Sequence, residues 1–413
     1  MSSDTAALPL AGQAHFSKSL QWLLGTACGL LIANVYYAQP LTGLITQALG
    51  MPRESAGLLV TLPLAGYGAG LLTIVPLADL FENRTLVLLL VGLEALCMAA
   101  LSLLGQPVPF LVAAFFVGAS AAAVQVLVPY VTFLAPEAER GKAVGKVVSG
   151  VMLGIMLARP AASLVSDLLG WRAIFAMSAT AMLALFALLR GVLPQRTPAP
   201  GLTYRALLLS LGRIYVSTPV LRRRAFYHAF LFGAFSVFWT AIPLWLTGPR
   251  FGLSQSGVAW VALAGVAGAI APPFAGRLAD LGHSKLGTAI AMILAVTAFV
   301  LSDIALTTDR TAGLCVLVAA AIMLDFAVSA NLVFGQRAIY ALGAAQRGRI
   351  NGLFMATFFV GGAVGSAMSG WLYSRYGWLG CSVLGIAMPL LALLYFASEP
   401  ESNDGHVTEE ARN

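Results

Sequence analysis

Long apolar segments dominate this sequence and constrain its fold more than any other feature. Runs of about 20 residues, the length that crosses a hydrocarbon core as an α-helix, follow one another with short polar connections. The chain is 59% hydrophobic and 10% charged, which excludes a soluble globular protein. The runs are too long for the alternating strands of an outer-membrane barrel. The sequence therefore predicts an all-α, multi-pass membrane protein.

The hydropathy pattern predicts twelve transmembrane helices. They cover residues 20–45, 56–78, 85–104, 108–134, 143–168, 173–192, 225–246, 257–278, 286–306, 312–340, 350–373 and 379–396. An even number of crossings places both ends of the chain on the same side of the membrane. This map also predicts short, polar tails before the first span and after the last.

The positive charge of the chain is concentrated in one predicted loop. Seven arginines and no acidic residue lie between positions 190 and 224, which accounts for the whole excess of 24 Lys+Arg over 17 Asp+Glu. An excess of basic residues marks cytoplasmic loops of membrane proteins. We therefore expect both termini to be cytoplasmic and the charge to serve membrane topology, so no nucleic-acid partner is expected.

Two sequence patterns occur once in each half of the chain. Residues 77–80 and 278–281 share the tetrapeptide Leu-Ala-Asp-Leu, and six identities in 140–171, including an Arg-Gly pair and a Gly-Trp pair, recur without gaps in 347–378. The repeats lie at equivalent places in two six-span units. Two bundles of the same orientation are typical of transporters that rock around a central site.

The duplication predicts how the chain is divided. The predicted parts are a cytoplasmic tail at 1–19, a six-helix bundle at 20–192, a basic cytoplasmic connector at 193–224, a second six-helix bundle at 225–397 and an acidic cytoplasmic tail at 398–413. Prolines at 194, 198 and 200 interrupt any helix at the start of the connector. Residues 204–215 could form a short amphipathic helix on the membrane surface.

Loop motifs give the sequence a resemblance to a known family over essentially its whole length. The segments 76–84 and 276–285, the Arg-Gly pairs at 140 and 347, and the segment Asn-Val-Tyr-Tyr-Ala-Gln-Pro at 34–40 resemble the major facilitator superfamily, most closely its twelve-span bacterial drug and metabolite exporters. The resemblance implies two pseudo-symmetric six-helix bundles in the bacterial inner membrane, with spans 1, 4, 7 and 10 lining a central cavity. It also implies that Asp79 and Asp280 pair with basic residues or helix ends across the interface between the bundles.

The resemblance further implies a cytoplasmic gate built from the loop motifs. Its expected residues are Asp79, Arg84, Arg140, Asp280, Lys285 and Arg347. These residues would hold the cytoplasmic side closed when the opposite side is open.

Three ionisable residues fall near the centres of predicted spans, where a charge is costly and usually functional. Glu94 lies in span 3, Arg159 in span 5 and Asp325 in span 10. Asp325 shares a helical face with Ser329 and Gln336. That polar stripe favours proton coupling or substrate contact by Asp325, and the alternative is a structural partner of a neighbouring polar group.

Arg159 keeps its charge at any physiological pH and therefore needs an anion. Asp325, Glu94 and an anionic group of the substrate remain open as its partner. Glu94 lies in a span that is peripheral in the family, so a local hydrogen bond is expected for it. His228 lies closer to the end of span 7 and is a further candidate.

Uncharged polar and aromatic residues complete the predicted site. The candidates are Asn34, Tyr37 and Gln39 in span 1, Gln125 in span 4, Trp239 in span 7 and Asn331 in span 10. Aromatic rings beside amides suit a mid-sized organic solute. Each of these residues could instead join helices without touching solute.

Catalytic and cofactor motifs are absent from the sequence. The four cysteines and four histidines are scattered, so the sequence predicts no catalytic residue, metal or cofactor site. We predict a monomeric secondary transporter, with a small molecule and protons as its partners, that exports a small organic compound in exchange for protons. The alternative is a proton symporter or facilitator that imports a sugar or an organic anion.

Overall fold

Helices make up nearly all of the described chain. The computed structural model describes residues 18–198, 201, 203–343 and 346–399. Most of the tails predicted at 1–19 and 398–413 lie outside the described residues. Ten helices in the described part are long and apolar enough to cross a membrane, which agrees with the all-α membrane fold that the sequence predicts.

The first six crossings each follow one predicted span. They are α1 (Lys18–Asn34) continued through η1 (Gln39–Leu41) and α2 (Thr42–Ala48); η2 (Arg53–Ser55), α3 (Leu58–Thr73) and η3 (Val75–Asp79); α4 (Asn83–Leu103); α5 (Pro107–Ala121) with α6 (Ala123–Leu134); α7 (Arg140–Leu169), which follows η4 (Glu137–Glu139); and α8 (Trp171–Val192). Turns in the backbone divide crossings 1 and 4 into two helices each.

Among the last six crossings, one is broken and two share a single helix. They are α10 (Pro219–Thr247); α11 (Gln255–Ala264), η5 (Gly265–Ile270) and α12 (Ala271–Asp280); α13 (Ser284–Ile304); α14 (Arg310–Tyr340); and α15 (Arg347–Ala397), which holds two crossings. Crossing 8 is broken by η5, so neither of its helices reaches the length of a full span. The two crossings of α15 meet at Gly377, whose φ of 61° is allowed for glycine and reverses the chain.

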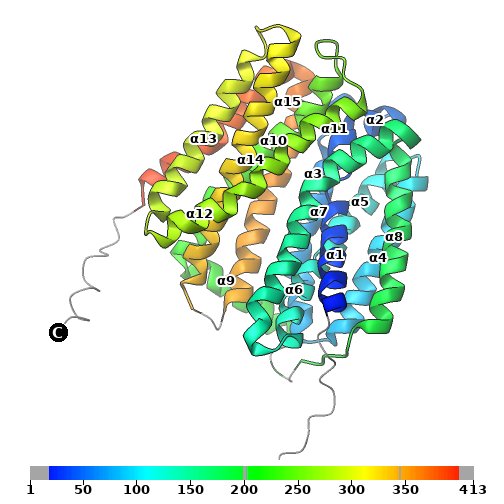
Figure 1. Cartoon of the computed structure of the whole chain (residues 1–413), viewed down its shortest axis with the longest axis vertical. Helices are drawn as coiled ribbons and strands as arrows, with labels where there is room; N and C mark the ends of the chain where they lie inside the picture. Colours follow the sequence, from blue (N-terminus) through cyan, green and yellow to red (C-terminus); the bar gives the residue numbers. More distant parts are fainter. Residues whose placement is uncertain (1–17, 199–200, 202, 344–345, 400–413) are drawn as a thin grey trace, which may run out of the picture.

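Two bundles stand side by side, one built from α1–α8 and the other from α10–α15 (Figure 1). In each bundle the first helix packs closely on the fifth crossing. A Cβ on Gly154 of α7 would lie 2.7 Å from Cα of Gly29 in α1, and one on Gly361 of α15 would lie 2.8 Å from Cα of Ala229 in α10. Gly154 and Gly361 are equivalent residues of the sequence repeat, so the repeat preserves a close helix contact.

The interface between the bundles is closed at the end away from the connector. There α3 packs on α15, where the hydroxyls of Thr61 and Ser366 lie 2.9 Å apart. The same end carries a 3.8 Å ion pair between Glu54 and Arg375. In addition, α7 packs on α11, and the hydroxyl of Ser256 donates to Asp167. Contacts among η2, α3, α7, α11 and α15 therefore seal this end.

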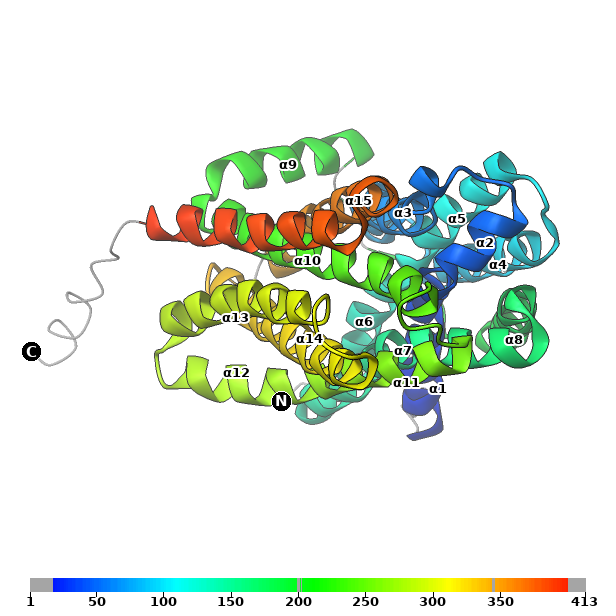
Figure 2. The same ribbon diagram turned by 90° about the horizontal axis from the view of Figure 1, so that it is seen from above.

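The connector contains an amphipathic helix that lies on the second bundle, and the segment before this helix is attached to the first bundle. The helix α9 (Tyr204–Ser217) buries Leu207, Leu211 and Ile214, and it lies along the outside of α10 and α15 (Figure 2). Before α9, the N–H of Arg196 donates to Glu82, which also caps the start of α4 by accepting from the backbone N–H groups of Arg84 and Thr85. The expected surface helix is thus present, two residues longer than the sequence suggests.

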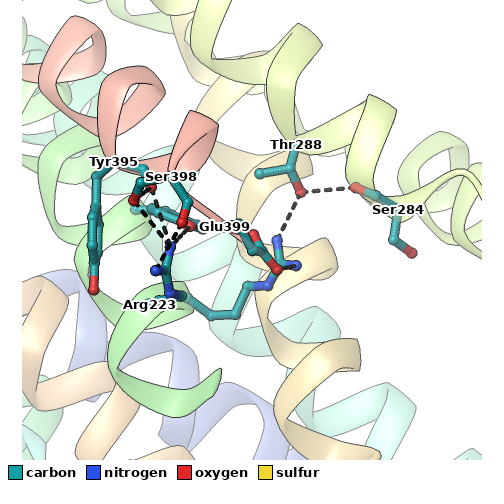
Figure 3. A network of polar contacts seen from close by, with 8 residues as sticks. Arg223, Ser284, Thr288, Tyr395, Ser398 and Glu399 are labelled. Carbon is teal, nitrogen blue, oxygen red and sulfur yellow. Dashed lines mark hydrogen bonds and ion pairs between the residues drawn. The ribbon is translucent and has the colours of Figure 1, made fainter. Parts of the chain in front are cut away.

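The last described residues are held against the start of α10 by two arginines (Figure 3). Arg224 forms a 2.9 Å ion pair with Glu399 and Arg223 donates to the carbonyls of Tyr395 and Ser398. These contacts lie at the same end of the molecule as the connector. The ends of α10 and α15 are therefore fixed to each other.

Candidate functional site

A buried ion pair joins the two bundles near the middle of the molecule. Nη1 of Arg159, on α7, lies 3.9 Å from Oδ2 of Asp325, on α14. Arg159 is 3% exposed and Asp325 is 6% exposed. Asp325 stands halfway along the 31-residue helix α14. Of the three anions considered for Arg159, the structure brings Asp325 to it.

Each member of the pair has a further partner from its own bundle. Nε of Arg159 donates a 2.9 Å hydrogen bond to Oε1 of Gln39, and Nε1 of Trp239 donates a 2.8 Å hydrogen bond to Oδ1 of Asp325. The guanidinium also lies over aromatic rings, 4.4 Å from the ring centre of Trp239 and 4.8 Å from that of Phe235. These rings stabilise a cation away from water.

The broken crossing 8 makes room for this cluster. A Cβ on Gly265, the first residue of η5, would lie 2.5 Å from Oδ2 of Asp325 and 3.1 Å from the Trp239 ring. A Cβ on Gly268 would lie 3.0 Å from Cβ of Asp325. The glycines therefore let the backbone of η5 approach the carboxylate, and a 3₁₀ segment inside a long helix often marks a hinge.

Glu94 lies in a separate network inside the first bundle. It accepts a 2.7 Å hydrogen bond from the amide of Asn34, whose carbonyl oxygen accepts a 2.5 Å hydrogen bond from Ser178. All three residues are buried. This is the local hydrogen bond expected for Glu94, and it places Asn34 among the helices of one bundle rather than on the cavity. Tyr37, also buried, lies in the turn after α1.

His228 and Asn331 form a third polar contact, in the second bundle. Nδ2 of Asn331 lies 3.0 Å from Nδ1 of His228, which links α14 to α10. The imidazole packs against the rings of Phe354 and Phe358, with centroids 5.8 and 4.7 Å away. Both polar residues are buried.

A cavity of about 900 Å³ opens on the connector side between the bundles. It is lined from crossings 2, 3, 4, 5, 10 and 11 together with the connector, so the expectation that spans 1, 4, 7 and 10 line it is met only for spans 4 and 10. Its polar lining residues are Asp79, Asn83, Gln125, Thr132, Arg196, Tyr340, Gln346, Arg347, Arg349 and Asn351. Three guanidinium groups and one carboxylate give this lining a positive balance. A volume of this size holds a metabolite-sized or drug-sized molecule.

The expected gate residues have different partners in this conformation. Asp79 lies 3.9 Å from Arg349 of the opposite bundle, whereas Asp280 pairs with Arg337, on α14 of its own bundle. Asp280 therefore pairs within its own bundle in this conformation, because Arg337 lies close to it. A third contact is that Nη2 of Arg84 donates to the carbonyl of Arg190.

The other gate residues lie at the surface or on the cavity. Arg140 and Lys285 are exposed, and Arg347 lines the cavity. Sequence reasoning missed Arg349 and Phe235. Their signals were present, since Arg349 follows Arg347 by two residues and Phe235 lies one helical turn before Trp239.

The described residues contain no group of three or more His, Cys, Asp or Glu side chains that could hold a metal ion. The buried cluster instead combines a fixed cation, a carboxylate and hydrogen-bonding groups from both bundles. Such a cluster can bind a proton or a polar solute, and it changes whenever the bundles move relative to each other.

Comparison with known proteins places the chain among transporters. The family model of the Major Facilitator Superfamily matches residues 22–339 and 251–412. The uncharacterized transporter YgaY of Escherichia coli O157:H7 is 35% identical over 381 residues, covering 92% of this chain and 95% of that protein. A relative from Streptomyces coelicolor, named a probable transporter, is 32% identical and covers 88% of this chain and 84% of its own.

Solved structures share the fold at low sequence identity. The nucleoside transporter NupG superposes with a TM-score of 0.74 at 16% identity, covering 92% of this chain and 98% of that one. A transporter of the POT family in complex with 5-aminolevulinic acid gives 0.72 at 14% identity, with 92% and 95% covered. The fold, the family model and the relatives agree with the sequence prediction: this multi-pass membrane protein belongs to the major facilitator superfamily and is a secondary transporter of small molecules, not an enzyme.

Proposed function

We propose that this transporter moves a small organic compound out of the cell in exchange for protons, with Asp325 as the proton-binding group. The observation that carries the proposal is the buried ion pair between Arg159 and Asp325, which belongs to both bundles. An ionisable pair at this depth is expensive to maintain and is rarely kept without a function. The outward direction rests on the resemblance of the loop motifs to exporters.

The pair explains how a proton would affect the movement of the bundles. When Asp325 is ionised, its attraction to Arg159 holds α14 against α7. A proton on Asp325 removes that attraction and leaves the Arg159 cation without its counter-ion in a buried place, which is unfavourable. Protonation thus favours a rearrangement in which Arg159 meets water or another partner. A solute that bonds to Asp325 competes with the proton, and competition at one group is the basis of exchange.

The conformation and the placement in the membrane complete the proposal. The cavity opens on the connector side, and the opposite side is closed by α3 with α15 and by α7 with α11. With the termini in the cytoplasm of a bacterial cell, this state faces inward, ready to accept solute from inside. Because both bundles that enclose the path come from one chain, the monomer is the transporting unit, divided at the connector into the two bundles.

A second candidate is the import of an organic anion together with a proton. Three guanidinium groups on the cavity lining and Arg159 beyond it favour this alternative, since they attract an anionic solute. An anion bound to Arg159 would take the place of Asp325, and a proton on Asp325 would then balance the charge. Solute and proton would travel in the same direction.

Proton movement driven by solute separates the two candidates. Purified protein in liposomes with a pH-sensitive dye inside is exposed to a panel of cationic drugs, sugars and carboxylic acids, each tested without and with an imposed pH gradient. Exchange predicts that added external solute drives protons out of acid-loaded liposomes. Acidification of the interior on adding a carboxylate would support symport and contradict export by exchange.

A further inference from the structure

The cavity ends before it reaches the charged cluster. On α3 its lining extends inward to Leu71, on α6 to Gln125 and on α15 to Leu353. Arg159 and Asp325 do not line it, and both are almost fully buried. A layer of protein therefore separates the open cavity from the ion pair in this conformation.

Two aromatic rings, one from each bundle, occupy the intervening layer. Tyr67 lies one turn deeper than Leu71 on α3, and Phe359 lies six residues, or about 9 Å of helix, deeper than Leu353 on α15. Their ring centroids are 4.5 Å apart, and they are 1% and 3% exposed. The pair bridges the interface between the bundles directly above the cavity.

The rings are linked to the cavity on one side and to the charged cluster on the other. On the cavity side, Nε2 of Gln125 donates a 3.2 Å hydrogen bond to the hydroxyl of Tyr67. On the inner side, Phe359 contacts Phe232 and Phe232 contacts Phe235, each with centroids 5.3 Å apart. Phe235 in turn packs on the guanidinium of Arg159. A continuous series of contacts thus joins Gln125 to the ion pair.

The helices α3 and α15 also lie close together in this layer. At Gly68, next to Tyr67, an added Cβ would lie 3.6 Å from the carbonyl oxygen of Ala356 and 3.6 Å from Cβ of Phe359. The helices α3 and α15 are therefore already in close contact here. A solute that moves inward between α3 and α15 must therefore displace the rings.

We propose that Tyr67 and Phe359 form an inner gate, which separates the cavity from the Arg159–Asp325 pair and is held shut by Gln125. A solute with a hydrogen-bond acceptor takes the hydrogen bond that the Gln125 amide donates to Tyr67, and this releases the phenol ring. The separated rings then pack on the apolar part of the solute. The inner gate selects solutes that combine a hydrogen-bonding group with a flat apolar surface. This inference goes beyond the proposed proton exchange and does not depend on the coupling ion.

Thiol accessibility tests the inner gate without knowledge of the solute. Two reporter variants are made, Leu71→Cys on the cavity side of the gate and Phe235→Cys beyond it. Membrane vesicles with the tails facing outward, checked by protease cleavage of the tail, are treated with a charged, membrane-impermeant methanethiosulfonate. The native cysteines give the background rate, which is measured on the chain without a reporter.

The rate of thiol labelling at each reporter tests the proposal. We expect rapid labelling at Leu71→Cys and slow labelling at Phe235→Cys. Adding Tyr67→Ala or Phe359→Ala should speed the labelling of Phe235→Cys about tenfold. This factor is the change in the gate's opening equilibrium that is expected when one aromatic pair is lost. Gln125→Ala should speed it by a smaller factor, because the rings remain.

A matched aromatic variant guards against general loosening of the helix. Phe354 is a buried ring of α15 that packs on His228 and not on the Tyr67 ring, so Phe354→Ala should leave the rate at Phe235→Cys unchanged. Equal labelling of the two reporters with the gate intact would overturn the proposal. So would equal acceleration by Phe354→Ala and Tyr67→Ala.

Discussion

Removal of the two central charges, singly and together, tests whether Arg159 and Asp325 depend on each other. Arg159→Gln leaves the Asp325 carboxylate buried with only the Trp239 hydrogen bond. Breaking a buried pair in this way costs about 3–5 kcal/mol. The 3.9 Å separation, longer than a hydrogen bond, places the expected cost at the lower end of that range.

The reverse substitution should cost less. Asp325→Asn leaves Arg159 charged, but the cation keeps its bond to Gln39 and the rings of Trp239 and Phe235. The double variant carries neither charge, so its loss should be smaller than the sum of the two single losses by about 1–3 kcal/mol, as for residues in direct contact.

Thermal unfolding of detergent-solubilised protein measures this non-additivity. Tryptophan fluorescence at one fixed heating rate gives an apparent midpoint for each of the four proteins, and a fixed rate is needed because unfolding of such proteins is usually irreversible. We expect the double variant to have a higher midpoint than Arg159→Gln alone. A double variant whose midpoint falls by the sum of the single decreases would show that the two charges are independent, and the reasoning would be refuted.

Three further predictions concern residues outside the pair. Gly154→Val should prevent accumulation of folded protein, because its side chain would meet the α1 backbone, whereas Gly145→Ala on the same helix has no neighbour within 4 Å of its Cβ and should be tolerated; fluorescence-detected size exclusion measures both. Partial burial alone would raise the pKa of Glu82, but hydrogen bonds from neighbouring hydroxyl and backbone groups outweigh it and hold that pKa below its usual range. The stability that Glu82 contributes is therefore present above the ordinary glutamate pKa and is lost as the pH falls through the lowered pKa. Acidification should therefore speed proteolysis in the connector. This pH effect should vanish in Glu82→Gln. Asn34→Ala should lower the free energy of unfolding by about 1–3 kcal/mol, because buried Glu94 loses its hydrogen-bond donor. Glu94→Gln should keep transport. Loss of all transport in Glu94→Gln would contradict a local structural role for Glu94.

The sequence predicted the helices well because the bilayer imposes one length and one composition on each crossing. It did not predict the break at η5, although Gly265 and Gly268 precede Pro272 and Pro273 and together weaken a helix. The break depends on the space required by Asp325, which belongs to another crossing. A local pattern contains no information about that neighbour.

The candidate site shows the same limit. Charge at mid-membrane was sufficient to select Arg159, Asp325 and Glu94, because an intramembrane charge is costly wherever it lies. Which of them meet depends on how the bundles are rotated and how close they stand, and this is a tertiary property. The sequence therefore left the partner of Arg159 open. Asp280 illustrates the point, since it pairs within its own bundle while the connector side is open.

Counterflow and proton-driven transport, compared in Asp325→Asn, test the central claim most directly. Counterflow exchanges labelled for unlabelled solute with no net proton movement, and proton-driven transport uses an imposed pH gradient; both are measured in liposomes with a solute found by the panel. If Asp325 is the proton-binding group, the variant keeps counterflow and loses acceleration by the pH gradient. Proton-driven transport that persists at the native rate in Asp325→Asn would contradict the account.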